Sequence, residues 1–323
     1  MFSSLEKNIS DIKPPNKWED NDGDIELFYL QDDLQEAEFI ADRIKKNIDS
    51  GVSASEIAII SRQRLDIYTK KITDVLSSYD IKTRDEAEFQ SLLSEEIIIL
   101  ILDTITISLN RSKPKEWQRV EKIWSSINGL HAYKEKNNIT SSMNDLGNLP
   151  VYILNDLNEV NNHNDLFQLS NKILNFFSLD ALQSYFPQYS QRDYLMRLLE
   201  DFSVKFWDSY CEVNKTSWNE AIIDFKGDNT ISCLTIHKSK GLEYEYVYFI
   251  GLEDSAFWGF KDNPEEERNV FFVCISRAKK YLAFSYCNKR ELWGSMKSNS
   301  SKQINEFHDL LNLYGIANVI KNP

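Results

Sequence analysis

Segment 234–243, with the sequence LTIHKSKGLE, changes abruptly from apolar residues to side chains that can donate hydrogen bonds. An apolar run that ends in this way is typical of a buried strand that opens into a functional loop. Gly241 permits close approach of the backbone to a ligand, and Glu243 adds an acceptor that suits a sugar hydroxyl. From the residue types alone, a solvated turn with incidental charges remains an equally good interpretation.

A second polar cluster begins at Pro264 with the sequence PEEER and contains Ser-Arg-Ala at 276–278. Proline suits a first helical turn, and the three glutamates complement the positive end of the helix dipole, so the acidic run is explained as a helix start. Arg277 lies among apolar residues of the helix predicted over 265–280. An arginine there is either paired within the fold or aimed at an anion across a cleft.

The elements that must position these clusters alternate between short apolar strands and amphipathic helices. The first helix has Asp32 or Asp33 as its cap and Gly51 at its end, and the second carries apolar residues over 65–76. Strand, helix, strand, helix in this order predicts a parallel sheet with crossover helices, and ligands bind at the carboxyl ends of such strands. The predicted strands are 25–30, 57–60, 231–236, 246–250 and 281–286, and the last predicted helix is 304–314.

Between the early and late strands the pattern becomes mostly helical. The expected fold class is therefore α/β, a parallel sheet domain interrupted by a mostly helical inserted domain. The predicted divisions are an irregular lead-in over 1–23, the first part of the sheet domain over 24–90, the helical insertion over 91–225 and the second part of the sheet domain over 226–323.

The composition limits the class of protein. A net charge of −13 over 323 residues argues against a broad basic surface for nucleic acid, although nine Lys/Arg against eight Asp/Glu over 231–290 permit a local groove. The four cysteines show no C-x-x-C pair and the four histidines are scattered, so no metal site is predicted. The amino terminus lacks a secretory signal pattern, and the apolar run 97–107 is too short for a bilayer. We therefore expect a soluble, cytoplasmic protein that is not attached to a membrane.

The two polar clusters resemble motifs V and VI of the UvrD/Rep/PcrA helicases of superfamily 1, through LTIHKSKGLEYEYVYFIGLED at 234–254 and EEERNVFFVCISRAKKYL at 265–282. Segment 32–62 is similar to the start of that family's second RecA-like domain, and 95–120 to the lead into its helical insertion. The resemblance covers about 25–315 in order. It implies a RecA-like sheet domain from the C-terminal half of such a helicase.

The resemblance also implies roles for individual residues. Arg277 matches the arginine finger that stabilises charge on the γ-phosphate of ATP from across a cleft, and Glu243 matches the residue that holds the ribose. Arg62 matches an arginine of unspecified role, and Trp258 stands where many relatives have proline. The other implied contacts are Gly241, Lys240 and Arg268 to the nucleotide, and His237, Thr235 and Ser239 to DNA.

The chain also departs from the family. It has no G-x-x-x-x-G-K-[ST] element, and no Asp-Glu-x-Gln element follows an apolar strand. We therefore expect ATP and Mg²⁺ to be bound mainly by an ATPase lobe outside these residues, in cis or in trans, and no ATP hydrolysis by these residues alone. The expected substrate is single-stranded or partly duplex DNA. The alternative is a non-catalytic DNA-binding or interaction subunit in DNA repair or antiphage defence, with a nuclease or repair protein as partner.

Overall fold

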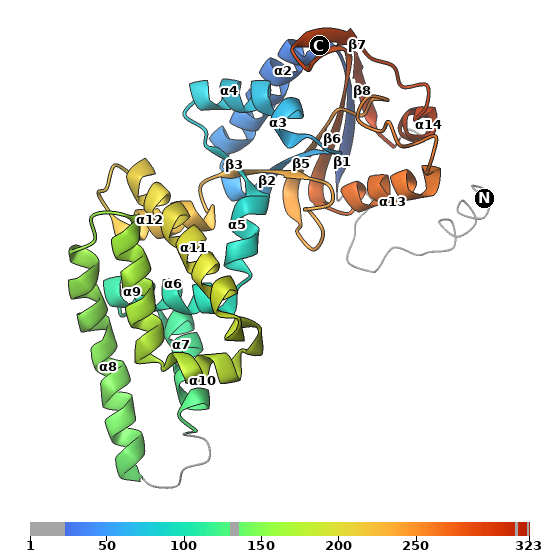
Figure 1. The fold of residues 1–323 in the computed structure, drawn as a ribbon. Helices are drawn as coiled ribbons and strands as arrows, with labels where there is room; N and C mark the ends of the chain where they lie inside the picture. Colours follow the sequence, from blue (N-terminus) through green and yellow to red (C-terminus); the bar gives the residue numbers. More distant parts are fainter. Residues whose placement is uncertain (1–22, 130–135, 314–315, 322) are drawn as a thin grey trace. The chain divides into compact units, whose positions relative to one another are not determined.

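The computed structural model describes residues 23–129, 136–313, 316–321 and 323 (Figure 1). The expected irregular lead-in therefore lies outside the described residues, apart from Gly23. The fold divides into two compact units, one made of 1–85 with 229–323 and the other of 86–228. These boundaries lie within five residues of those expected for the helical insertion, and each unit is described here by itself.

The first unit is built on an eight-stranded sheet, in which seven strands have the order β3-β4-β2-β5-β6-β1-β8 and the eighth, β7, pairs antiparallel with β6. Every other pair of neighbouring strands is parallel. The predicted α/β fold class is thus confirmed. The strands are β1 (Asp24–Asp32), β2 (Ile57–Ser61), β3 (Thr83–Asp85), β4 (Ile231–Thr235), β5 (Tyr244–Ile250), β6 (Ala278–Leu292), β7 (Ser295–Ser298) and β8 (Asn318–Lys321).

Helices cover both faces of this sheet, with α2, α3 and α4 on one face and α13 and α14 on the other (Figure 1). The Asp32 side chain caps α2 by accepting from the backbone amides of Leu34 and Gln35, as expected. Gly51 follows this helix at φ +100°, and its N–H bonds the Ile48 carbonyl. The helices are α2 (Asp33–Asp49), α3 (Leu65–Tyr68), α4 (Lys70–Ser78), α13 (Pro264–Ile275) and α14 (Asn305–Leu313), with a 3₁₀ turn at Ala54–Glu56.

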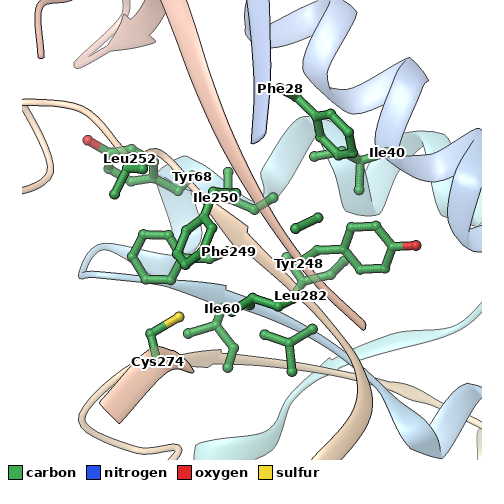
Figure 2. Packing of buried hydrophobic residues seen from close by; sticks show 14 of the residues in the cluster. Phe28, Ile40, Ile60, Tyr68, Tyr248, Phe249, Ile250, Leu252, Cys274 and Leu282 are labelled. Carbon is green, nitrogen blue, oxygen red and sulfur yellow. The ribbon is translucent and has the colours of Figure 1, made fainter. Parts of the chain in front are cut away.

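The core of the first unit lies between the sheet and these helices. All five residues of β2 are buried, as expected for a parallel strand covered on both faces. Figure 2 shows side chains of β2 and β5, such as Ile60 and Phe249, packed among residues from the neighbouring elements. Directly after β5, Gly251 has φ +81°, and an added Cβ would lie 2.5 Å from the Tyr68 ring. Glycine is required there by both the conformation and the space.

The second unit is helical and has its own core. The apolar run 97–107 forms most of a buried helix, in which Asp103 binds the Arg119 guanidinium through two hydrogen bonds of 2.5 and 2.6 Å. None of the described helices is long and apolar enough to cross a membrane. The helices are α5 (Glu86–Leu93), α6 (Glu96–Leu109), α7 (Pro114–Ile127), α8 (Lys136–Asn158), α9 (His163–Phe176), α10 (Leu179–Tyr185), α11 (Arg192–Glu212) and α12 (Trp218–Lys226), with a 3₁₀ turn at Pro187–Ser190.

The structure corrects three boundaries of the predicted elements. The helix predicted over 265–280 ends at Ile275, because Ala278 already pairs with Tyr244 as the first residue of β6. β6 continues to Leu292 because its second half pairs with β1 and β7. The single helix predicted over 65–76 is divided into α3 and α4 at Thr69. Arg277 therefore lies in the turn between α13 and β6 rather than on a helix.

Candidate functional site

The candidate site lies at the carboxyl edge of the sheet, where β2, β4 and β5 end at the same level. Ser61 pairs with Thr235 on one side and with Ile250 on the other, so the three strand ends are in register. The Ile236 amide then bonds the Ser61 carbonyl at 2.9 Å and starts the loop that follows β4. Residues 236–243, called the 236–243 loop below, thus begin where ligands bind in parallel sheets.

The polar side chains of the 236–243 loop differ in exposure, because one is buried and the others are exposed. Ser239 is fully buried, and its hydroxyl donates to the Ile236 carbonyl at 2.8 Å, so this hydroxyl folds the loop. His237, Lys240 and Glu243 are exposed. Gly241 has φ +84° with open space where a Cβ would stand. The exposed side chains, and not Ser239, are those that a ligand could reach.

Arg277 holds this loop against the end of α13. Its Nη1 donates to the carbonyls of Ser239 (3.1 Å) and Leu242 (2.9 Å), its Nε to the Val273 carbonyl (3.1 Å) and its Nη2 to the Ser276 hydroxyl (2.8 Å). Each of these acceptors is neutral. Among the described residues, no carboxylate forms an ion pair with Arg277. Arg277 is thus bonded within the fold, which was one of the two alternatives left open by the sequence, but its partners leave its charge uncompensated.

Arg62 joins the two polar clusters. Its Nε and Nη2 bind both oxygens of the Glu267 carboxylate, at 2.7 and 2.9 Å, and its Nη1 lies 2.9 Å from Nε2 of His237. Because a guanidinium only donates, Nε2 of His237 must accept, and the neutral ring then carries its proton on Nδ1. The loop after β4, the end of β2 and the first turn of α13 are thereby connected by one side chain.

The buried position of Glu267 was missed when the acidic run was interpreted only as a helix start. Asn263 caps α13 by accepting from the Glu266 amide, and Glu266 remains exposed, in keeping with that interpretation. Glu267 is buried instead. A sequence signal existed, because Glu267 shares a helical face with the apolar residues Val270, Phe271 and Cys274.

Arg268 is not brought to the 236–243 loop. Its guanidinium binds both oxygens of Glu306 on α14, at 2.6 and 2.9 Å. Its side chain is 37% exposed and that of Glu306 is 25% exposed, so this pair remains open to solvent. The described contacts of Arg268 thus connect α13 to α14, and they place no nucleotide-binding group beside Arg277.

A hairpin beyond the same edge carries a residue that the sequence reasoning did not single out. β6 and β7 are joined by Trp293 and Gly294, whose φ values are +53° and +73°. Positive φ at both central residues is the pattern of a type I′ turn, for which Asn-Gly is the usual pair. Trp293 is 67% exposed, and the Arg64 guanidinium lies 5.3 Å from the centre of its ring. The X-Gly pair between two polar alternating runs was the available signal.

The loop after β5 contributes a second exposed tryptophan. Phe257 is buried in the core, whereas Trp258, which stands where many relatives have proline, is 67% exposed. A cavity of about 310 Å³ lies beside Trp258, with Arg62, Gln63 and Glu266 in its lining. Arg62, one of its lining residues, also contacts His237. Among the described residues, no group of three or more His, Cys, Asp or Glu side chains could hold a metal ion.

A parallel sheet with a polar loop that begins at its carboxyl edge, interrupted by a helical unit, is consistent with a RecA-like α/β fold. The family described as UvrD-like helicase C-terminal domain matches residues 131–289. The chain is thus similar to the C-terminal half of UvrD-like helicases.

Similar curated proteins include several ATP-dependent DNA helicases. The chain is 24% identical to PcrA of Bacillus subtilis (strain 168), over 94% of this chain and 46% of the relative. It is 27% identical to PcrA of Staphylococcus aureus (strain Mu50), over 91% of this chain and 45% of the relative. A match to Rep of Escherichia coli (strain K12) is 39% identical over 20% of this chain and 10% of the relative. The chain thus spans about half the length of the PcrA relatives that it matches.

Proposed function

We propose that this chain provides the second lobe of an ATP-dependent DNA helicase or translocase. An ATPase lobe from outside these residues, in cis or in trans, binds ATP and Mg²⁺, and Arg277 completes the site from the facing lobe. The observation that carries the proposal is the half-buried guanidinium of Arg277, which bonds only neutral acceptors where α13 ends and β5 and β6 begin. The relatives named above, called ATP-dependent DNA helicases, support the same assignment.

The donors of Arg277 fit this role. A guanidinium has five N–H groups. Four of them are accounted for by the bonds to three carbonyls and one hydroxyl, so one N–H on Nη2 has no acceptor among the described residues. Neutral acceptors orient the group without cancelling its charge. An oriented positive charge with one available donor is what stabilises a transferring γ-phosphate.

The nucleotide and DNA contacts extend from the same loop. We assign Glu243 and Lys240 to the nucleotide side, because both side chains are exposed near Gly241, where nothing occupies the Cβ position. We assign His237, and Thr235 at the end of β4, to the DNA backbone, and the exposed Trp293 to stacking on a base. Ser239 and Arg268 support these groups through the loop and α14 rather than by direct contact.

The test is the ATPase activity of the chain reconstituted with a Walker-A-bearing lobe. Arg277→Ala should lower turnover by about 10³-fold or more, the range known for arginine fingers. DNA binding should stay nearly unchanged. Lys279→Ala, which removes an exposed positive charge two residues away, is the matched control and should keep wild-type turnover. Wild-type turnover in Arg277→Ala would refute the assignment and favour the non-catalytic alternative.

A further inference from the structure

Arg290 is the largest side chain in the described chain that is fully buried, at 1% exposure. It lies on β6, three residues before the exposed Trp293 at the hairpin tip. An arginine is almost never buried to this extent unless its charge is compensated. The groups that compensate its charge indicate the role of Arg290.

Two buried glutamates from distant parts of the chain bind the Arg290 guanidinium. Nη2 donates to one oxygen of Glu36 on α2 at 2.8 Å, and Nη1 lies 2.8 Å from the other oxygen. Nε donates to Glu253, in the loop after β5, at 2.8 Å. Both glutamates are 0% exposed. One guanidinium therefore fixes the base of the hairpin to α2 and to the loop after β5.

The neighbouring residue is anchored to the same helix. The Glu291 amide donates to the Asp33 carboxylate at 2.9 Å, and Lys71 of α4 bridges the carboxylates of Asp33 and Glu291 at 3.0 and 3.1 Å. The first turn of α2 thus binds two consecutive residues of β6. The hairpin cannot pivot at this point without breaking both sets of contacts.

Segment 62–68 connects this anchor to the 236–243 loop. The ring of Tyr68 lies 4.7 Å from the Arg290 guanidinium, and Arg64 lies over Trp293. At the start of the segment, Arg62 contacts His237. The same seven residues therefore touch the base of the hairpin, its tip and the loop proposed to contact DNA.

Stability does not explain such a cluster. Replacing a buried ion pair or triad with well-packed neutral groups is often neutral or stabilising. Two carboxylates around one guanidinium also leave a net negative charge inside the core if both are ionised. The cluster provides a fixed geometry, because the planar guanidinium can donate to these two carboxylates in one arrangement only.

We propose that Arg290 is a positioning residue that fixes the tip of the β6–β7 hairpin relative to the 236–243 loop, so that a base on Trp293 and the phosphate at His237 belong to one bound strand in one register. The inference rests on the proposed DNA contacts of Trp293 and His237. The anchoring itself can be measured without DNA.

The first measurement is the distance between spin labels at Lys238→Cys in the loop and Ser295→Cys in the hairpin, in the full chain carrying Cys211→Ser. Cys211 is the one native cysteine that is not buried. Unmutated Arg290 should give a narrow distance distribution. Arg290→Lys and the neutral variant Arg290→Met/Glu36→Gln/Glu253→Gln should give broadened or shifted distributions. The neutral variant keeps the test valid if Arg290→Lys does not fold.

The matched control is Lys289→Met, which removes an exposed positive charge from the same strand and should keep the narrow distribution. An unbroadened, unshifted distribution in both folded Arg290 variants would overturn the proposal. The thermal unfolding midpoint of each variant confirms that it is folded. If Arg290 only stabilised the fold, its replacement would lower this midpoint without changing the label distance measured at lower temperature.

The second measurement is the fluorescence of 2-aminopurine placed at successive nucleotides of a partly duplex oligonucleotide, whose junction fixes the register. The wild type should quench one position most strongly. Both Arg290 variants should lose this preference, and an unchanged profile would also overturn the proposal. Trp293→Ala distinguishes the assigned DNA contact of Trp293 from the anchoring by Arg290. If this variant quenches 2-aminopurine like the wild type, the assigned DNA contact is refuted, and the spin-label distances still test the anchoring.

Discussion

Replacing Arg62 with methionine should lower the free energy of unfolding of the sheet unit by about 3 kcal/mol. The Arg62 and Glu267 side chains are 13% and 7% exposed and share two bonds of 2.7 and 2.9 Å. Removing one partner of a buried ion pair costs about 3–5 kcal/mol, because the other charge stays buried and unpaired. The residual exposure of Arg62 places the expected cost at the lower end of that range.

The double variant Arg62→Met/Glu267→Met removes both charges and should lie within about 1 kcal/mol of the wild type, so the coupling energy should be about 2 kcal/mol or more. Arg268→Met is the control, because the Arg268–Glu306 pair has similar bonds but side chains that are 37% and 25% exposed. It should cost about 1 kcal/mol or less.

The assay is urea unfolding followed by circular dichroism, combined with hydrogen exchange of the α13 amides, since two units need not unfold together. Loss of Arg62 should increase exchange in the first turn of α13, where Glu267 lies. The reasoning fails if Arg62→Met costs no more than Arg268→Met. It also fails if the coupling is below about 0.5 kcal/mol, the limit within which independent sites add.

Two further outcomes are expected. Trp293→Asn should stabilise the chain by up to about 1 kcal/mol, because Asn-Gly suits the left-handed turn better than Trp-Gly, and it should weaken binding of single-stranded oligonucleotides by about 1–3 kcal/mol through loss of stacking. Unfolding curves test the gain in stability and binding titrations test the loss of affinity, and an unchanged affinity would contradict the assigned contact of Trp293 with a base. Burial lowers the pKa of His308, whose ring bonds Tyr29 and the Leu252 carbonyl, so its stabilising contribution should be complete above about pH 6.5 and fall as the pH decreases below it. His308→Gln should flatten the stability profile between about pH 7 and 5, and an unchanged slope would refute this.

The sheet and its main helices could be predicted because their signals are local. Asp32 caps α2 through amides two and three residues away, and the apolar runs of β2 and β5 need no distant partner to be recognised. The edge strands β3 and β8 gave no such signal, because they are short and mostly polar or half-exposed. The end of α13 was missed because pairing with Tyr244 starts β6 at Ala278, and that pairing is a tertiary contact.

The same difference between local signals and tertiary contacts decides which side chains of the candidate site could be predicted. The resemblance and the residue types found the 236–243 loop and Arg277. They could not show that Ser239 turns inward, since its acceptor is the Ile236 carbonyl of a turn that forms only in the fold. Nor could they show that Arg268 binds Glu306, 38 positions away, or that Arg62 binds Glu267, 205 positions away. Spacing along the chain carries no information about such partners.

A comparison of the partners of four arginines of the sheet unit gives the strongest reason to assign Arg277 to an anion outside the described residues. Arg62 and Arg268 each bind a carboxylate through two nitrogens, and Arg290 binds two carboxylates. Carboxylates are not scarce in a chain with 50 Asp and Glu against 37 Lys and Arg. Arg277 nevertheless bonds three carbonyls and a hydroxyl, which orient its guanidinium and leave its charge intact. A fold that pairs Arg62, Arg268 and Arg290 with carboxylates but only orients Arg277 has kept this positive charge available for a ligand.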